Sequence, residues 1–254
     1  MRNILAIAGK ELRGYFASPI AYVLLGFFAL VYGWFFYVPL AFFNRQSMQM
    51  QAGMGGAMNI NQMMIAGVFT NTTVLILFIM PMITMRTYAE EKRSGTIELL
   101  LTSPLTDLQI IMGKFLGAMG LYAAMLALTL LHMSLLFLYG NPAWKPVVTG
   151  YLGLLLMGGC FISIGLLISS LTKNQITAGM VTFAVFLMLW VINWIGSFVG
   201  PTAQAVLSHL SITDHFDDFA RGVIDTKHLV YYLSFITFGL FLTAKAVDSE
   251  RWRG

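Results

Sequence analysis

Charged residues of this chain gather in one short segment, 86–104, which lies between two long apolar stretches. The segment reads RTYAEEKRSGTIELLLTSP and contains Arg86, Glu90, Glu91, Lys92, Arg93 and Glu98. Side chains of both signs at this density form ion pairs and charge-assisted hydrogen bonds, and the adjacent leucines offer apolar contacts. We therefore interpret segment 86–104 as the place where a soluble partner binds.

A second group of polar side chains lies nearer the C-terminus and comprises His209, Asp214, His215, Asp217, Asp218, Asp225 and His228. Imidazole nitrogens and carboxylate oxygens are ligands of divalent metal ions. In a simpler interpretation, Thr213 or Asp214 caps a short surface helix and the acidic residues favour its first turn. The sequence favours the simpler interpretation, so we predict no metal ligand here.

Methionines form a third group between residues 48 and 64: Met48, Met50, Met54, Met58, Met63 and Met64. Thioether sulfur suits Cu(I). The neighbouring glycines and glutamines instead favour a flexible spacer or a partner-binding surface, which we take as the expected role.

Motifs for covalent or nucleotide chemistry are missing from the sequence. Gly9-Lys10 and Gly113-Lys114 are followed by Glu11 and Phe115, so neither completes the GxxxxGK[ST] pattern of a phosphate-binding loop. Hydrolase, zinc-protease and kinase signatures are also missing. We expect no enzyme, no catalytic residue and no bound cofactor in this chain.

The composition places most of the chain in a membrane. Of its 254 residues 58% are hydrophobic and 10% are charged, against about 25% charged in soluble domains. Six apolar stretches are long enough to cross the hydrocarbon core as helices, and they lack the alternation typical of a membrane barrel. The predicted fold is all-α, with a transmembrane domain 19–254 whose spans are 19–43, 68–85, 110–139, 147–171, 176–199 and 229–247.

Local signals define several helix ends. Ser18 precedes Pro19 as an N-cap, and Thr106 and Gln109 have the spacing of a capping box. Gly95 can end a helix that continues the second span, because glycine accepts the left-handed conformation. Thr96 can then cap a further short helix.

Positive charge is distributed unequally between the two sides of the six spans. Of the 15 Lys and Arg residues, only Arg45, Lys145, Arg221 and Lys227 fall on the side opposite the termini. The positive-inside rule therefore predicts that both termini and segment 86–104 are cytoplasmic and that residues 200–228 are extracytoplasmic.

The first eighteen residues predict a separate amphipathic helix. Its apolar stripe comprises Ile4, Leu5, Ala8, Leu12, Tyr15 and Phe16, and the opposite face carries Arg2, Lys10 and Arg13. Such a helix lies at the inner leaflet in contact with lipid. An ordinary flanking helix and a helix that docks a partner are both compatible with this pattern.

Ionisable groups are almost missing from the spans. His132 lies well inside one of them and is expected to be bonded within the bundle, whereas Lys114 and Lys245 lie near span ends and can snorkel. Gradient-driven carriers usually need a titratable group in the bilayer. The energy for any transport must then come from a separate protein.

Several motifs resemble the membrane subunits of ABC transporters of the ABC-2 type. They are Lys10-Glu11-Leu12, the run EEKRSGTIELL at 90–100, Ser103-Pro104, Lys114 and the run DHFDDFARG at 214–222. In particular, the chain resembles the permeases associated with gliding motility and with nitrous-oxide reductase maturation in bacteria. The resemblance covers nearly the whole chain.

This resemblance implies the fold of an ABC-2 exporter in a bacterial inner membrane, with a cytoplasmic coupling helix. It implies that a separate ATPase subunit binds ATP and Mg²⁺, and that two six-span subunits pair, either as a homodimer or with a related permease. An extracytoplasmic accessory protein is a further implied partner, whereas the small net charge of +4 argues against nucleic acid. The residues implied to contact the ATPase are Glu90, Glu91, Arg93, Gly95, Thr96, Glu98, Leu99, Leu100 and Pro104, and Lys10, Glu11 and Arg13 belong to the interfacial helix.

Two functions from different classes remain open at this point. The chain can be the permease of an ATP-driven exporter, or a scaffold that transmits ATPase movements without transporting anything. A gradient-driven carrier is disfavoured by the uncharged spans. Gly113 and Gly117 form a GxxxG pattern that can serve either a dimer or packing within one subunit, and packing within one subunit is favoured.

Overall fold

The computed structural model describes residues 1–51, 64–196, 198 and 200–251, and all regular secondary structure in these ranges is helical. Within them, six helices are long and apolar enough to cross a membrane. These are α2 (Pro19–Gln51), α3 (Ala66–Thr84), α6 (Asp107–Tyr139), α7 (Trp144–Ser170), α8 (Gln175–Gly196) and α11 (Thr226–Arg251). The shorter helices are α1 (Arg2–Ala17), α4 (Ala89–Ser94), α5 (Ile97–Leu101), α9 (Pro201–Leu210) and α10 (Asp214–Ala220). The all-α, six-span prediction is thereby confirmed.

The local start signals act as the sequence predicts. The Ile20 N–H donates to Ser18 Oγ at 3.3 Å. At the start of α6, the Gln109 N–H donates to Thr106 Oγ1 and the Thr106 N–H donates to Gln109 Oε1, which completes the capping box. Helix α2 continues to Gln51 rather than ending at residue 43, since no glycine or proline interrupts residues 44–51.

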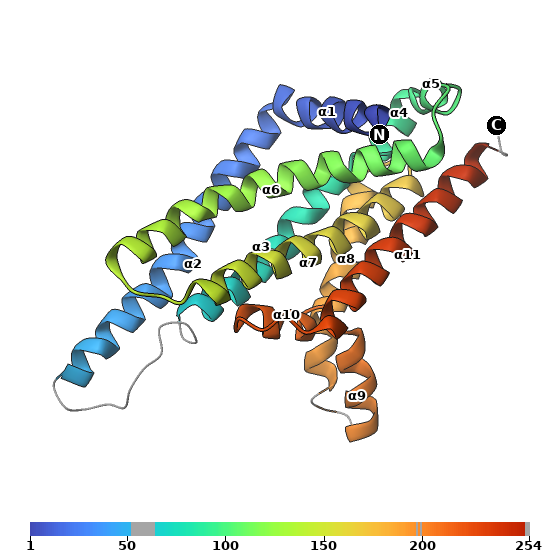
Figure 1. Ribbon diagram of the computed structural model, residues 1–254. Coiled ribbons are helices and arrows are strands. Elements are labelled where there is room, and N and C mark those ends of the chain that lie inside the picture. The colour runs from blue at the N-terminus through green and yellow to red at the C-terminus, as the bar shows by residue number, and fades with distance from the viewer. Residues whose placement is uncertain (52–63, 197, 199, 252–254) are drawn as a thin grey trace.

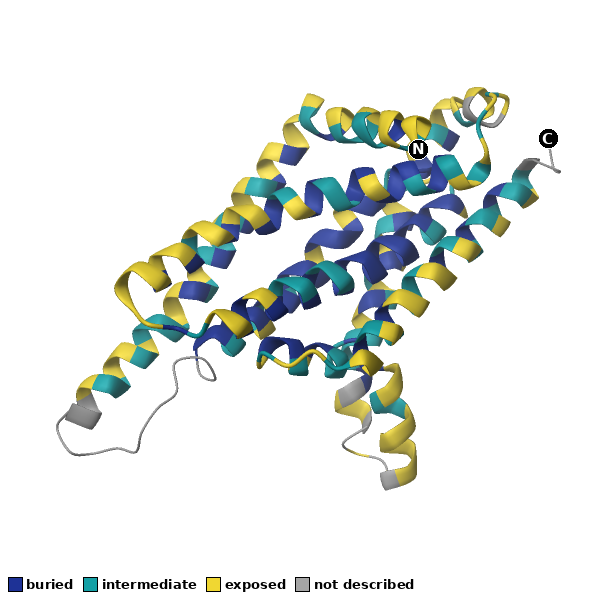
Figure 2. Ribbon diagram, in the orientation of Figure 1, coloured by how far each residue is buried: buried dark blue, intermediate teal, exposed yellow. Residues whose placement is uncertain are grey.

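Helix α7 forms the centre of the bundle and packs against α3, α6, α8, α10 and α11. Its glycines lie where a neighbouring helix comes closest: a Cβ on Gly158 would lie 2.1 Å from Tyr122 Cε1, and one on Gly165 would lie 2.2 Å from Thr84 Oγ1. Figure 2 shows the buried residues concentrated along α3, α7 and one side of α6. Close packing inside one subunit therefore accounts for these small residues.

Helix α1 packs against the GxxxG pattern of α6 in the same chain. A Cβ on Gly113 would lie 2.6 Å from Ile7 Cβ, and one on Gly117 would lie 2.6 Å from Glu11 Cβ. The face of α1 that packs against Gly113 and Gly117 is the buried one. Ile7 on this face is buried, whereas Leu5 of the predicted stripe is 66% exposed. The favoured interpretation, packing within one subunit, holds for this pair.

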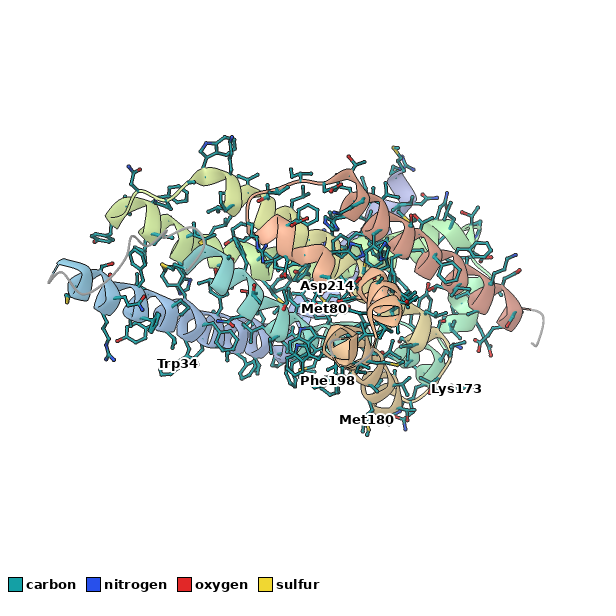
Figure 3. All side chains as sticks on the ribbon, turned by 90° about the horizontal axis from the view of Figure 1, so that it is seen from below. Trp34, Met80, Lys173, Met180, Phe198 and Asp214 are labelled. Atoms are coloured by element: carbon teal, nitrogen blue, oxygen red, sulfur yellow. The ribbon has the colours of Figure 1, made fainter. Side chains whose placement is uncertain are left out.

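The outer faces of the bundle are apolar, as expected for helices in lipid. Large exposed side chains on α2, α8 and α11 include Trp34, Met180 and Phe238, and Figure 3 places Trp34 at the outer edge of α2. Between α2 and α6 the ring of His132 packs against those of Tyr32 and Phe36, and its Nδ1 has no hydrogen-bond partner among the described residues. Ring packing, rather than a bond to Nδ1, therefore holds this histidine.

The N-terminal helix and the C-terminal end of α11 lie at one end of the bundle. Figure 1 shows α1, α4, α5 and the C-terminal end of α11 together at the top, and α9 and α10 at the opposite end. The methionine-rich loop is described only at its edges: Met54, Met58 and Met63 lie outside the described residues, and so does the side chain of Met50.

Candidate functional site

Segment 86–104 folds into two short helices joined at a glycine. Helix α4 ends at Ser94, and Gly95 follows with φ of 74°, a left-handed conformation that permits the chain to turn sharply. Helix α5 begins at Ile97, and the chain then enters the capping box of α6. The Thr96 hydroxyl lies 2.9 Å from Ser94 Oγ and 3.5 Å from the Glu91 carbonyl oxygen, so it points back toward α4.

Most of the predicted partner-binding residues share an exposed surface at the tip of this segment. Leu99 is 74% exposed and lies next to the charged Glu98. The side chain of Leu100 lies outside the described residues. The predicted contacts that are exposed, which we call the tip, are Glu90, Arg93, Gly95, Thr96, Glu98, Leu99 and Pro104.

Glu91 differs from the other predicted contacts because it belongs to a half-buried ion cluster at the base of the segment. Lys114 Nζ of α6 lies 2.9 Å from Glu91 Oε2 and 3.0 Å from Glu11 Oε1 of α1. Lys10 Nζ lies 3.6 Å from Glu91 Oε1 and is mostly exposed. We call Lys10, Glu11, Glu91 and Lys114 the ion cluster. It joins α1, α4 and α6.

Lys114 occupies the centre of the ion cluster, with a side chain that is 1% exposed. Its Nζ also donates to the Thr87 carbonyl oxygen at 2.7 Å and lies 4.9 Å from the centre of the Tyr88 ring. A buried ammonium is costly unless oxygen acceptors surround it, and here three of them do. The expectation that Lys114 snorkels to the surface is therefore wrong, because α1 covers the position and supplies a carboxylate.

A second buried lysine joins segment 86–104 to the far side of the bundle. Lys92 of α4 donates to the Ser170 carbonyl oxygen at the end of α7 and to the Glu250 carboxylate near the end of α11. Its side chain is 3% exposed. The base of the segment is thus bonded to four helices that surround it: α1, α6, α7 and α11.

Ser169 of α7 fixes the chain where α3 passes into α4. Its Oγ accepts from the Tyr88 N–H and the Ala89 N–H, both at 3.1 Å, and donates to the Met85 carbonyl oxygen at 3.1 Å. One hydroxyl thereby satisfies three buried backbone groups at the junction. The sequence gives no signal for this role, since Ser169 is one of several small polar residues in an apolar span.

Replacing Ser169 with alanine is expected to loosen this junction. Two buried N–H groups lose their acceptor, which costs about 1–3 kcal/mol in free energy of unfolding. Thermal unfolding in detergent and faster hydrogen exchange at Tyr88 and Ala89 measure the effect. Ser170→Ala is the matched control, because the Ser170 hydroxyl donates to the Leu167 carbonyl oxygen of its own helix. Equal losses in the two variants would contradict the assignment.

A groove of about 470 Å³ runs beside the ion cluster between α1 and the base of α4. Arg86 lies over the Tyr15 ring at 4.5 Å from its centre, and the Tyr15 hydroxyl donates to the Ile83 carbonyl oxygen at 3.0 Å. Burial raises the pKa of this hydroxyl above its ordinary value, so it keeps its proton at neutral pH. Of the predicted interfacial residues, Lys10 and Arg13 are exposed and Glu11 faces the cluster.

The second polar group of the sequence is brought together at the opposite end of the molecule. Helix α10 has Thr213 at its N-cap position, but the acceptor for the Asp214 N–H is Ser211 Oγ, at 3.2 Å. The predicted cap by Thr213 or Asp214 is therefore replaced by one from Ser211. His228 makes direct contacts with both His215 and Asp218.

Comparison with known proteins gives one family match. A family model described as ABC-2 family transporter protein matches residues 5–246, which include α1, segment 86–104 and the six long helices almost to their ends. A search of curated proteins found no match.

Proposed function

The chain belongs to the ABC-2 family of transporter proteins, and from this premise we propose that segment 86–104 couples its transmembrane helices to ATP hydrolysis by a separate ATPase subunit. As a member of this family the chain is a membrane permease subunit of an ABC transporter. The observation that carries the proposal is the contrast within segment 86–104. Its tip is exposed, while its base is bonded to four helices of the bundle.

The tip has the chemistry of a docking surface. Leu99 presents an apolar side chain to water, and burying it in a partner's cleft stabilises a complex by about 1.5–3 kcal/mol. Glu90, Arg93 and Glu98 are exposed on the same segment and carry charges of both signs, which favour specific orientation and fast association. Gly95 is exposed and has a positive φ, so the chain turns between α4 and α5 and the two helices form a compact projection rather than one straight helix.

The base can pass a movement of the tip into the membrane. Lys114 links α4 to α1 and α6, and Lys92 links it to α7 and α11. An ATPase that displaces the tip therefore pulls on helices that pack along the whole bundle. Helix α7 packs against α3, α6, α8, α10 and α11, so a movement that reaches α7 spreads through the bundle.

We infer further that two copies work together, in the export direction, with both termini in the cytoplasm. The apolar outer faces of α2 and α8 leave surface for a second copy as well as for lipid. The common location of α1, the end of α11 and segment 86–104 agrees with the charge asymmetry of the loops.

Leu99→Ala is expected to weaken binding of the ATPase about tenfold or more, since about 1.4 kcal/mol corresponds to a factor of ten. The measurement is the amount of nucleotide-binding subunit that co-purifies with the tagged chain from native membranes. Thr102→Ala is the matched control, because Thr102 is exposed on the same segment and its hydroxyl bonds to Glu98 of the same turn. If no nucleotide-binding subunit co-purifies with the unmutated chain, the proposed function fails.

A further inference from the structure

Two histidines and a carboxylate form a continuous chain of contacts at the end of the bundle opposite segment 86–104 (Figure 1). His215 Nε2 of α10 lies 3.2 Å from the His209 carbonyl oxygen, and His215 Nδ1 lies 2.6 Å from His228 Nδ1 of α11. His228 Nε2 lies 2.8 Å from Asp218 Oδ2. Three polar contacts thus connect the two rings to two oxygen acceptors.

The number of ring protons does not match the number of contacts. Two neutral imidazoles carry one N–H each, whereas each of the three contacts needs one donor. The His209 carbonyl oxygen can only accept, so it takes the proton on His215 Nε2, and the bond between the two Nδ1 atoms takes the proton of His228. The lone pair on His228 Nε2 then faces the Asp218 carboxylate, and this contact requires one more proton or a bound cation.

A third ligand lies beside the same contact. One ligand atom from each of Asp218, Asp225 and His228 lies within 4.8 Å of the others. One imidazole nitrogen and two carboxylate oxygens form a mixed donor set that neutralises a divalent cation, and borderline metals such as zinc accept it. We propose that His228, Asp218 and Asp225 bind one divalent transition-metal ion, and that His215 is a positioning residue that orients the His228 ring.

The surrounding residues hold the rings as an outer shell of a metal site does. His228 is 6% exposed. The His215 ring stacks on Tyr231 with 3.8 Å between ring centres, and the Tyr231 hydroxyl donates to the Leu210 carbonyl oxygen at 3.0 Å. A metal-bound histidine commonly donates its second N–H to an acceptor that fixes its tautomer and orientation, and His215 Nδ1 is that acceptor for His228.

Access and geometry are both compatible with metal binding. The side chains of Asp218 and Asp225 are 36% and 40% exposed, so an ion can reach them from solvent, and a pocket of about 440 Å³ lies beside the rings of His215 and His228. Ligand atoms on one tetrahedral zinc stand about 3.3 Å apart, so Asp218 and His228 must separate slightly and Asp225 must approach. Lys227 Nζ, 3.1 Å from Asp225 Oδ2, is mostly exposed and can turn away. A bound ion would join α10 to the start of α11.

The test uses untagged full-length protein in detergent, stripped with a chelator and dialysed against Zn²⁺ or Co²⁺. We expect about one ion per chain, with Co²⁺ absorption bands typical of bound cobalt. His228→Ala and Asp218→Asn should lower affinity at least tenfold, whereas Asp217→Asn, which changes the adjacent carboxylate, should not. His215→Ala should weaken binding about 10–100-fold, and His215→Asn, whose amide oxygen can accept the same hydrogen bond, should recover part of it.

Lys227→Ala should strengthen binding, because it removes a cation that competes for Asp225. The proposal is overturned if the unmutated protein binds no ion, or if Asp217→Asn loses the ion as fully as Asp218→Asn does. It is also overturned if acidification, but neither Zn²⁺ nor Co²⁺, raises the melting temperature through His228, since the missing charge is then a proton. None of these readouts depends on ATPase coupling, so they stand apart from the proposed function.

Discussion

Lys114→Met is expected to lower the free energy of unfolding by about 3–5 kcal/mol, the cost of removing one partner from a buried ion pair. The substitution leaves the carboxylates of Glu11 and Glu91, each about one-sixth exposed, without the ammonium that lies within 3.0 Å of both. Lys10 cannot replace it, because its side chain is 69% exposed and its Nζ stays in solvent, 3.6 Å from Glu91 Oε1. Thermal unfolding or SDS titration of the purified protein measures the loss.

The triple variant Lys114→Met, Glu11→Gln, Glu91→Gln separates stability from coupling. Replacing a whole buried ion cluster by neutral groups is often close to neutral for stability, so this variant should recover most of the loss. It should not recover stimulated ATPase activity in the assembled transporter, because α1, α4 and α6 are no longer joined by charge. Lys245→Met, which removes an exposed lysine of α11, is the control.

Two outcomes would count against this account of the ion cluster. If Lys114→Met unfolds at the same temperature as the unmutated protein, Lys114 does not hold the three helices together. If the triple variant folds and still shows full ATPase stimulation, the cluster stabilises the fold without transmitting movement. In that case Lys92, with its bonds to α7 and α11, and Ser169, with its bonds to Tyr88 and Ala89, become the candidate connections.

The sequence predicts the six spans and the capping box because both depend on residues close together in the chain. Hydropathy over twenty residues and the Thr106–Gln109 spacing are local properties. The ion cluster is different, since Glu11 and Lys114 are 103 residues apart. The sequence pattern of neither segment predicts that α1 packs along α6.

One signal could have located the ion cluster. Lys114 lies directly after Gly113 and three residues before Gly117. These glycines lack side chains, so a neighbouring helix can approach α6 closely at this point. A lysine beside a close helix contact is more consistent with a partnered charge than with a snorkelling one. The pairing of His215 with His228 carries no comparable signal, because it depends on the angle at which α10 meets α11.

Gly117→Val is expected to separate α1 from α6 and to abolish coupling. A Cβ at this position would lie 2.6 Å from Glu11 Cβ and 3.3 Å from the Ala8 carbonyl oxygen, so backbone as well as side chain must move. Overpacking of this kind costs about 1–3 kcal/mol, and displacement of Glu11 removes one carboxylate from Lys114. Gly120→Ala is the matched control, since its Cβ would meet Leu12 at an ordinary 3.5 Å.

Docking of α1 can be followed by carbodiimide cross-linking of Lys10 to Glu91, whose charged atoms lie 3.6 Å apart across α1 and α4. The unmutated protein and Gly120→Ala should give the cross-linked peptide, and Gly117→Val should lose it together with stimulated ATPase activity. A Gly117→Val protein that keeps the cross-link would show that α6 shifts enough to accommodate the valine while α1 stays docked. One that loses the cross-link and still couples would show that α1 is dispensable, and that the bonds of α4 to α6, α7 and α11 are sufficient to transmit movement.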